Sequence, residues 1–310
     1  MATPRRSPFD PTRRRLLLAG AGGLVLAACG SGGDGGGDGD DAAARSTTTS
    51  DAGGSGDGGA LTLIRVFALE QAAAIPLRLP LAFADDEGVP TDEAPDAIEV
   101  TAVSPAGVAS TPVEVARRSD GIPSPYFPFE ATLDEPGRWE LVIDVGSART
   151  STELTVRPRE ELAVVPGPGD PLPSIPTPTT ADALGIEPLC TATPPCPLHE
   201  VGLDQALTAG LPVVLLVSTP AYCQTAICGP VLDLLVARRA ELAGRATVLH
   251  AEVYTNDRAE ETTPTVNALG LRYEPSLFLA AADGTVVTRL DYTFDASELD
   301  EALESLLAPA

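Results

Sequence analysis

Cys223 and Cys228, separated by four residues, are a pair whose type and spacing could support thiol chemistry. If both lay on one α-helix, their side chains would point about 140° apart around the axis and could not form a disulfide. A disulfide therefore requires Cys223 in the loop before a helix, or a helix that begins only near Pro230, where proline suits the first turn. Nearby helix N-terminal amides would favour a nucleophilic Cys223 thiolate, with Cys228 as its resolving partner.

A second pair, Cys190 and Cys196, is separated by five residues that include two prolines, and His199 follows three positions later. The simplest interpretation is a small structural disulfide, which we predict. The pair could instead pass electrons to Cys223 and Cys228, or contribute with His199 to a metal site. Soft thiolates and an imidazole suit copper(I). Zinc fits less well, because the cysteine spacings are five and four rather than two. We predict no required cofactor and no metal ligand, with copper as the alternative.

His250 lies in an apolar segment, 248–254, that is expected to form a strand. Alternation places His250 and Glu252 on the same face of that strand. One interpretation is a hydrogen-bonded pair at the edge or end of the sheet. The other is that one of these residues accepts a proton from the thiols, which makes His250 a candidate catalytic residue beside Cys223 and Cys228.

The fifth cysteine, Cys29, follows an N-terminal export signal. The apolar run 16–28 comes after three arginines and is too short to span a bilayer, so residues 1–28 are expected to be a signal peptide. Thr-Arg-Arg-Arg-Leu-Leu at 12–17 resembles a twin-arginine signal, and Leu-Ala-Ala-Cys at 26–29 resembles a bacterial lipobox. This resemblance implies a lipoprotein cut before Cys29, with lipid such as palmitate on that thiol. The alternative is an ordinary secretory signal with a chance cysteine.

Composition divides the remaining chain into regions. The Gly/Ser-rich stretch 29–60 has almost nothing to bury and is expected to be a disordered tether. Residues 61–157 contain short apolar alternations between turn residues, which predict an all-β immunoglobulin-like sandwich without a cysteine. Its seven expected strands are 61–67, 77–83, 98–103, 113–116, 129–133, 139–145 and 154–156. The Pro-rich segment 158–188 is expected to be an extended linker.

Strands and helices alternate in residues 189–310, which predicts an α/β domain. The expected helices are 203–209, 230–242, 265–269 and 297–307, and the expected strands are 212–218, 248–254, 276–281 and 285–290. Asp283-Gly284 marks a hairpin between the last two strands, and Asp295 could cap the last helix. Across the whole chain, 20 basic and 44 acidic residues give a net charge of −24. This balance argues against a nucleic-acid partner.

Residues 189–309 resemble the thioredoxin-like fold, through the cysteine pair where the first long strand turns into a helix and through Pro275. In that family a cis-proline before the hairpin faces the cysteines, and Pro275 is the matching position. The spacing departs from the family's usual two-residue separation. One class of peroxiredoxins uses a four-residue spacing but has threonine three residues before its reactive cysteine, where this chain has Pro220. Sco-type copper chaperones use a three-residue spacing and a distant histidine.

The resemblance implies thiol-disulfide exchange through Cys223 and Cys228, with Pro275 and His250 at the site. The partners would be exported proteins or redox partner proteins, and the protein would be lipid-anchored on the extracytoplasmic face of the cell membrane. One alternative is a Sco-like copper-binding assembly factor whose ligands are the same two cysteines, assisted by His250 or His199. The other is a non-enzymatic lipoprotein whose four remaining cysteines form two structural disulfides.

Overall fold

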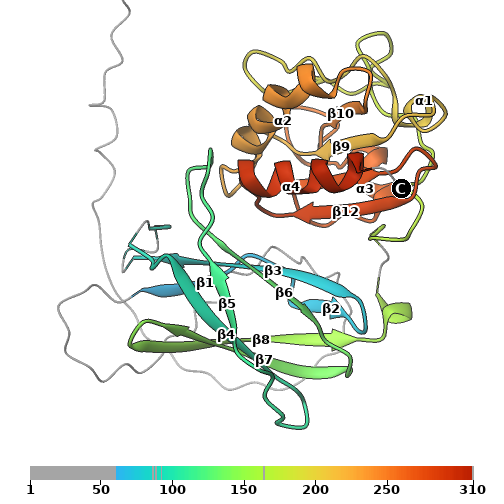
Figure 1. Ribbon diagram of the computed structural model, residues 1–310. Coiled ribbons are helices and arrows are strands. Elements are labelled where there is room, and N and C mark those ends of the chain that lie inside the picture. Colours follow the sequence, from blue (N-terminus) through green and yellow to red (C-terminus); the bar gives the residue numbers. More distant parts are fainter. Residues whose placement is uncertain (1–60, 86, 88, 92, 163–164, 309–310) are drawn as a thin grey trace, which may run out of the picture. The chain divides into compact units, whose positions relative to one another are not determined.

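The computed structural model describes residues 61–308 except 86, 88, 92, 163 and 164 (Figure 1). The predicted signal peptide, the lipobox cysteine Cys29 and the predicted tether lie outside the described residues. Every element described below belongs to one compact unit. Within the described ranges, no helix combines the length and the apolar character needed to cross a membrane.

The N-terminal part of the described chain is built from two β-sheets. Its strands are β1 (Thr62–Arg65), β2 (Glu70–Ala72), β3 (Pro76–Ala84), β4 (Ala97–Val103), β5 (Val113–Ala116), β6 (Phe127–Thr132), β7 (Gly137–Val145) and β8 (Ala148–Arg157). One sheet has the order β1-β3-β6 and the other the order β2-β8-β7-β4-β5. All seven predicted strands are present. The additional strand, β2, has only three residues and pairs in parallel with β8.

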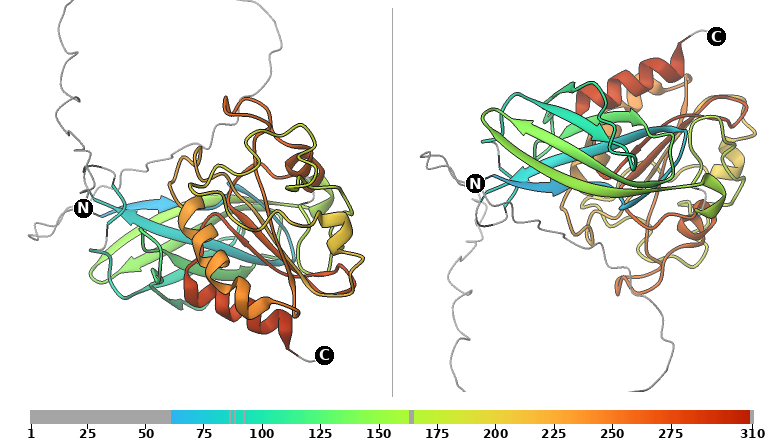
Figure 2. Two further views of the ribbon diagram at one scale, coloured as in Figure 1. Left: turned by 90° about the horizontal axis from the view of Figure 1, so that it is seen from above. Right: turned by 90° about the horizontal axis from the view of Figure 1, so that it is seen from below.

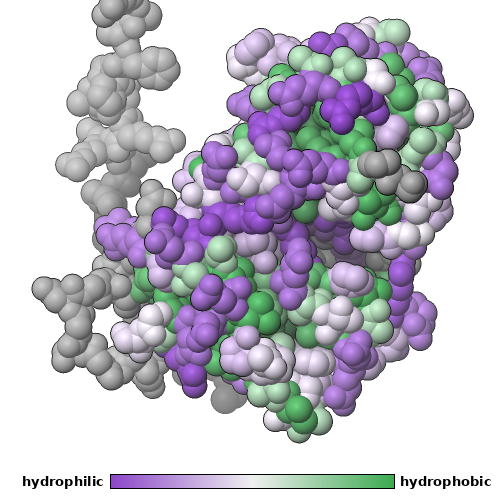
Figure 3. Space-filling model, viewed as in Figure 1, coloured by the Kyte–Doolittle hydropathy of each residue, from purple (hydrophilic) through white to green (hydrophobic). Residues whose placement is uncertain are grey.

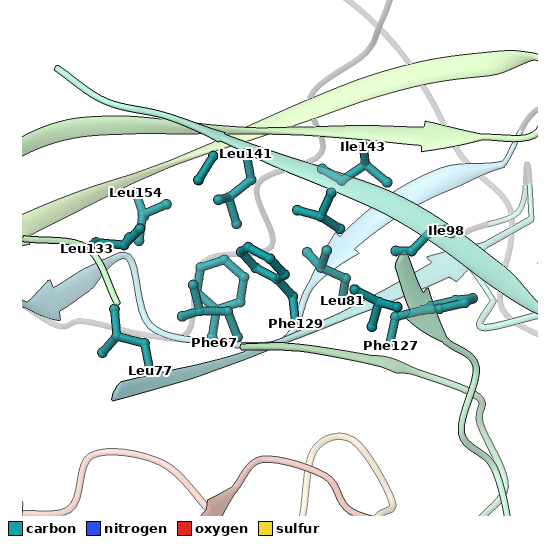
Figure 4. Close-up of a cluster of buried hydrophobic side chains, with 14 of the residues drawn as sticks. Phe67, Leu77, Leu81, Ile98, Phe127, Phe129, Leu133, Leu141, Ile143 and Leu154 are labelled. Carbon is teal, nitrogen blue, oxygen red and sulfur yellow. The ribbon is translucent and has the colours of Figure 1, made fainter. Parts of the chain in front are cut away.

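A hydrophobic core lies between these two sheets (Figure 4). Alternate residues of each strand point inward, so that Leu81 of β3 and Phe129 of β6 meet Leu141 and Ile143 of β7. All four side chains are at most 2% exposed, and burial of a large apolar side chain contributes about 1.5–3 kcal/mol. The sequence has no cysteine in this region, so packing of this kind holds the two sheets together.

The C-terminal part is an α/β arrangement, as the alternating pattern predicts. Its elements are α1 (Leu203–Ala206), β9 (Val213–Val217), α2 (Cys228–Leu242), β10 (Thr247–Ala251), α3 (Pro264–Leu269), β11 (Ser276–Ala280), β12 (Val286–Asp291) and α4 (Ala296–Leu307). The sheet order is β10-β9-β11-β12, with β10 parallel to β9 and β11 antiparallel to both of its neighbours. The predicted cap is confirmed, because the Asp295 side chain accepts a hydrogen bond from the Glu298 amide.

Helices cover both faces of this four-stranded sheet. Val214 and Leu216 of β9 face the cluster formed with α2 and α4, two helices that lie side by side (Figure 2). The alternate residues Val213, Leu215 and Val217 face the cluster formed with α1 and α3. Because all five residues of β9 are buried, the sequence reads as a continuous apolar run, as expected for a central strand covered on both sides.

The Pro-rich segment predicted to be a linker packs against the α/β region. The Leu172 amide donates to the Gly284 carbonyl oxygen, and Pro171 forms an isolated β-bridge with Thr285 of the hairpin. Leu172 and Ile186 are at most 5% exposed. Proline prevents regular structure here, but it leaves these apolar side chains free to be buried. The segment therefore forms part of the fold rather than a free spacer.

A buried ion pair joins the β-strand region to helix α4. The guanidinium of Arg78 in β3 donates to both carboxylate oxygens of Glu298, at 2.5 and 2.6 Å, and to the carbonyl oxygens of Asp291 and Thr293. The Tyr126 hydroxyl also donates to Glu298.

The surface of the molecule differs from its interior. Hydrophilic side chains are spread over the face shown in Figure 3, and hydrophobic side chains form smaller, separate patches on it.

Candidate functional site: two thiol pairs at the ends of β9 and β10

Cys223 lies in the loop between β9 and α2, and Cys228 is the first residue of α2. This is the arrangement that a disulfide-forming pair with four intervening residues requires. The Cys223 amide donates to the Thr219 carbonyl oxygen, and the Ala226 amide donates to the Cys223 carbonyl oxygen, so the loop folds back on itself. The Cys228 amide points at the Cys223 sulfur, 3.4 Å away. Cys228 is fully buried, whereas Cys223 is partly exposed.

The two thiols of this pair have opposite pKa shifts. The pKa of Cys223 is lowered to about 5, first by hydrogen bonding from the Cys228 thiol and then by the Thr225 hydroxyl and backbone amides. The pKa of Cys228 is raised, because its thiol donates to Cys223 and is buried. Cys223 is therefore a thiolate at neutral pH and Cys228 a thiol. This asymmetry suits one nucleophile and one resolving cysteine.

Pro275 directly precedes β11, and the Glu274–Pro275 peptide bond is cis, as the thioredoxin-like resemblance implies. The preceding residue, Glu274, interacts electrostatically with both cysteines of the pair. Burial and the negative charge of Cys223 both raise the pKa of the Glu274 carboxyl, and its charge in turn raises the pKa of Cys228. Sequence reasoning did not single out Glu274, although it directly precedes the proline that was singled out.

The second thiol pair lies in a compact cluster with both histidines of the chain. The Cys196 sulfur is 3.3 Å from His199 Nε2 and 3.5 Å from His250 Nδ1. The Cys190 sulfur is 3.8 Å from His250 Nδ1, and the two imidazole nitrogens are 3.2 Å apart. Four potential ligand atoms thus lie within 4.8 Å of one another. Cys190, His199 and His250 are at most 6% exposed.

Neighbouring residues fix the His250 ring and the Cys190 loop. His250 Nε2 lies 2.9 Å from the Ser218 hydroxyl and 3.2 Å from the Ser218 carbonyl oxygen, at the end of β9. The buried Glu252 carboxylate accepts hydrogen bonds from the Thr191 amide and hydroxyl, at 2.6 and 2.7 Å. The Thr191 hydroxyl in turn accepts from the Ala221 amide, which lies two residues before Cys223. One threonine therefore connects the loops that carry the two thiol pairs.

The structure groups the predicted site residues differently from the sequence interpretation. His250 was expected beside Cys223 and Cys228, but both of its ring nitrogens are directed at the Cys190 cluster and at Ser218. The predicted Cys190–Cys196 disulfide is not formed, since the four cysteines of the described chain are free thiols. Sequence reasoning placed His199 near this pair but missed Ser218, whose contact with His250 depends on the pairing of β9 with β10.

No family model matches the chain, and no curated protein matches it. Solved structures to which it is similar include the Lin-41 filamin domain, at 16% identity and a TM-score of 0.23, covering 31% of this chain and 91% of that domain. Two structures of Salmonella α-2-macroglobulin, the mutant Y1175G and the protein reacted with methylamine, are 15% and 14% identical. Their TM-scores are 0.27 and 0.26, with 44% of this chain covered and 9% of theirs.

Proposed function

We propose that the protein catalyses thiol-disulfide exchange through Cys223 and Cys228. The observation that carries the proposal is the pairing of a partly exposed Cys223 thiolate with a buried Cys228 thiol at the first residue of α2. The surrounding elements support a thioredoxin-like domain, because the pair follows the first long strand of the α/β sheet and Pro275 directly precedes the hairpin. His250 does not contact the pair, so copper binding by Cys223, Cys228 and a histidine has no comparable support.

The reaction proceeds in two steps, which together oxidise the cysteine pair and reduce one substrate disulfide. The Cys223 thiolate attacks a disulfide of an exported protein, which forms a mixed disulfide and releases one substrate thiol after proton uptake. Cys228 then loses its proton and attacks the Cys223 sulfur, which closes the Cys223–Cys228 disulfide and releases the second substrate thiol. The substrate gains two electrons and the Cys223–Cys228 pair loses two. A redox partner protein must then return two electrons to the pair. The reverse sequence forms a disulfide in the substrate.

A trapping experiment tests this assignment. In the Cys228→Ser variant, the mixed disulfide should accumulate on Cys223 when a disulfide-containing protein such as insulin is added, because nothing can resolve it. The Cys223→Ser variant should form no adduct and should reduce insulin at the background rate. The double variant Cys190→Ser/Cys196→Ser is the matched control and should still turn over. Insulin reduction that depended on this second pair instead, or that survived Cys223→Ser, would contradict the proposal.

Glu274 is the candidate acceptor for the proton that Cys228 must lose. Its carboxyl interacts with both thiols, and its raised pKa brings it closer to neutral pH, where a proton acceptor works best. Glu274→Gln should slow decay of the mixed disulfide while leaving its formation by Cys223 largely unchanged. Stopped-flow measurement of both phases checks this. Equal slowing of the two phases would indicate that Glu274 acts only on the fold or on Cys223.

We also propose the location and the role of the N-terminal region. The lipobox-like sequence ending at Cys29 supports a lipid-anchored protein on the extracytoplasmic face of the cell membrane, where exported proteins carry disulfides. The two-sheet region with a shared core supports an immunoglobulin-like sandwich that serves as a spacer or interaction module. The anchor would be tested by metabolic labelling with palmitate, which should be lost in Cys29→Ala.

A further inference from the structure

The Cys190 cluster has the dimensions of a tetrahedral metal site. In a tetrahedral zinc site with Zn–S of about 2.3 Å and Zn–N of about 2.05 Å, sulfur and nitrogen ligands are about 3.6 Å apart and two nitrogens about 3.4 Å apart. Three of the four sulfur–nitrogen distances here are 3.3, 3.5 and 3.8 Å, and the nitrogen–nitrogen distance is 3.2 Å. The other two pairs of ligand atoms lie within 4.8 Å. The four measured edges therefore match such a tetrahedron to within about 0.3 Å.

The hydrogen bonds of His250 and Cys190 also suit a metal. A carbonyl oxygen can only accept, so the contact of Ser218 O with His250 Nε2 places the proton on Nε2 and leaves the Nδ1 lone pair facing the cluster. Histidine ligands are typically oriented in this way by a carbonyl or carboxylate on their other nitrogen. The Cys196 amide donates to the Cys190 sulfur at 3.3 Å, which fixes the position of that sulfur within the cluster.

The charge of the four ligands distinguishes between a divalent ion and copper(I), both of which bind sulfur and nitrogen ligands. Two thiolates with two neutral imidazoles carry two negative charges. A divalent ion neutralises both charges, whereas copper(I) neutralises only one and leaves a net charge of −1 on the buried site. Four protein ligands with no open position are typical of structural zinc rather than of a catalytic metal.

We propose that Cys190, Cys196, His199 and His250 form a structural site for a divalent thiophilic ion, with zinc as the expected occupant. The site ties the loop before α1 to strand β10, elements that are far apart in sequence. It is independent of the exchange reaction assigned to Cys223 and Cys228. From the sequence, copper(I) fitted better than zinc because of the cysteine spacings. The spacing could not reveal the fourth ligand, His250, because it comes from a strand far from the pair in sequence.

Cobalt(II) substitution tests the site without relying on any variant. The full-length chain, reduced with a phosphine and handled without oxygen, should bind one Co²⁺ per molecule. Its spectrum should show the intense visible bands of tetrahedral coordination and thiolate-to-cobalt charge transfer, and one equivalent of Zn²⁺ should abolish both. A weak octahedral spectrum, no bound cobalt after complete reduction, or a Cys190–Cys196 disulfide that resists the reductant would overturn the proposal.

Variants identify the ligands. Cys190→Ser and His199→Gln should each weaken zinc binding, measured by chelator competition, beyond the roughly 10–100-fold loss seen when only a residue that orients a ligand is removed. Cys223→Ser is the matched control and should retain one zinc with unchanged affinity. Loss of zinc in Cys223→Ser, or unchanged affinity in His199→Gln, would overturn the four-ligand assignment. Insulin reduction that survived Cys223→Ser would contradict the exchange proposal alone and would leave the metal site unaffected.

Discussion

Replacing Cys228 by alanine is expected to raise the pKa of Cys223 from about 5 toward the ordinary thiol range, because the Cys228 thiol lowers it most. A folded pKa of about 5 means that the wild-type thiolate persists above that pH and is lost as the pH falls through it. Alkylation by iodoacetamide should therefore be nearly constant at neutral pH. A rise of two units would leave about a tenth of the thiol ionised at pH 6, so the variant should react roughly tenfold more slowly there.

Other groups around Cys223 define the controls for this experiment. Thr225→Val should raise the pKa less than Cys228→Ala, because the threonine hydroxyl contributes less. Glu274 and Tyr254 also face the thiol, but burial raises the pKa of Tyr254, so it stays neutral in this range. Rates at Cys223 would be followed by peptide mass spectrometry, with the urea-unfolded chain as reference. A wild-type profile that matched the unfolded chain would refute the lowered pKa.

Glu298→Gln is expected to reduce the free energy of unfolding by about 3–5 kcal/mol, the usual cost of leaving one member of a buried ion pair without its partner. The side chains of Arg78 and Glu298 are 11% and 9% exposed, so water cannot replace the lost charge. With the glutamine NH2 group in place of Oε2, the Tyr126 hydroxyl and an Arg78 guanidinium N–H would each face a donor instead of the oxygen that now accepts from them. Urea unfolding monitored by circular dichroism gives the measurement.

The exposed pair between Asp144 and Arg149 provides the matched control for this substitution. Asp144→Asn removes the same kind of charge from a bidentate arginine contact, but the Arg149 side chain is 70% exposed. Solvent screening makes such surface pairs weak, so the control should unfold at nearly the same urea concentration as the wild type. Similar losses in both variants would show that burial of Glu298 has no special role.

The sequence predicted the regular elements well, because alternation reflects which face of a strand is covered. Leu249 and Ala251 point toward the α1 and α3 side of the sheet, and Val248 points to the other side, as the pattern of residues 248–254 predicts. Strand β2 escaped prediction because Glu70–Ala72 carries no apolar alternation. Its pairing depends on β8, a strand about 85 residues later, which no local pattern reveals.

The candidate site was predictable only in its local parts. The spacing of Cys223 and Cys228 constrained where the helix could begin, and the helix begins at Cys228. The grouping of His250 with Cys190 and Cys196 depends on an irregular loop that covers one end of the sheet. The Leu198 carbonyl oxygen in that loop accepts from the His250 amide. Loops of this kind have no periodicity, so the sequence could suggest the ligand types but not their meeting point.

The burial of Leu172 and Ile186 bears on how this protein can be dissected. A fragment cut at the predicted border before residue 189 would lose both side chains and expose the surfaces they cover. The amide of Val286, which donates to the Asp170 carbonyl oxygen, would lose its partner, and the Thr177 hydroxyl that accepts from the Leu203 amide would be gone. The shortest autonomous version of the α/β region consequently has to start upstream of Asp170, inside the stretch whose proline content makes it resemble a dispensable spacer.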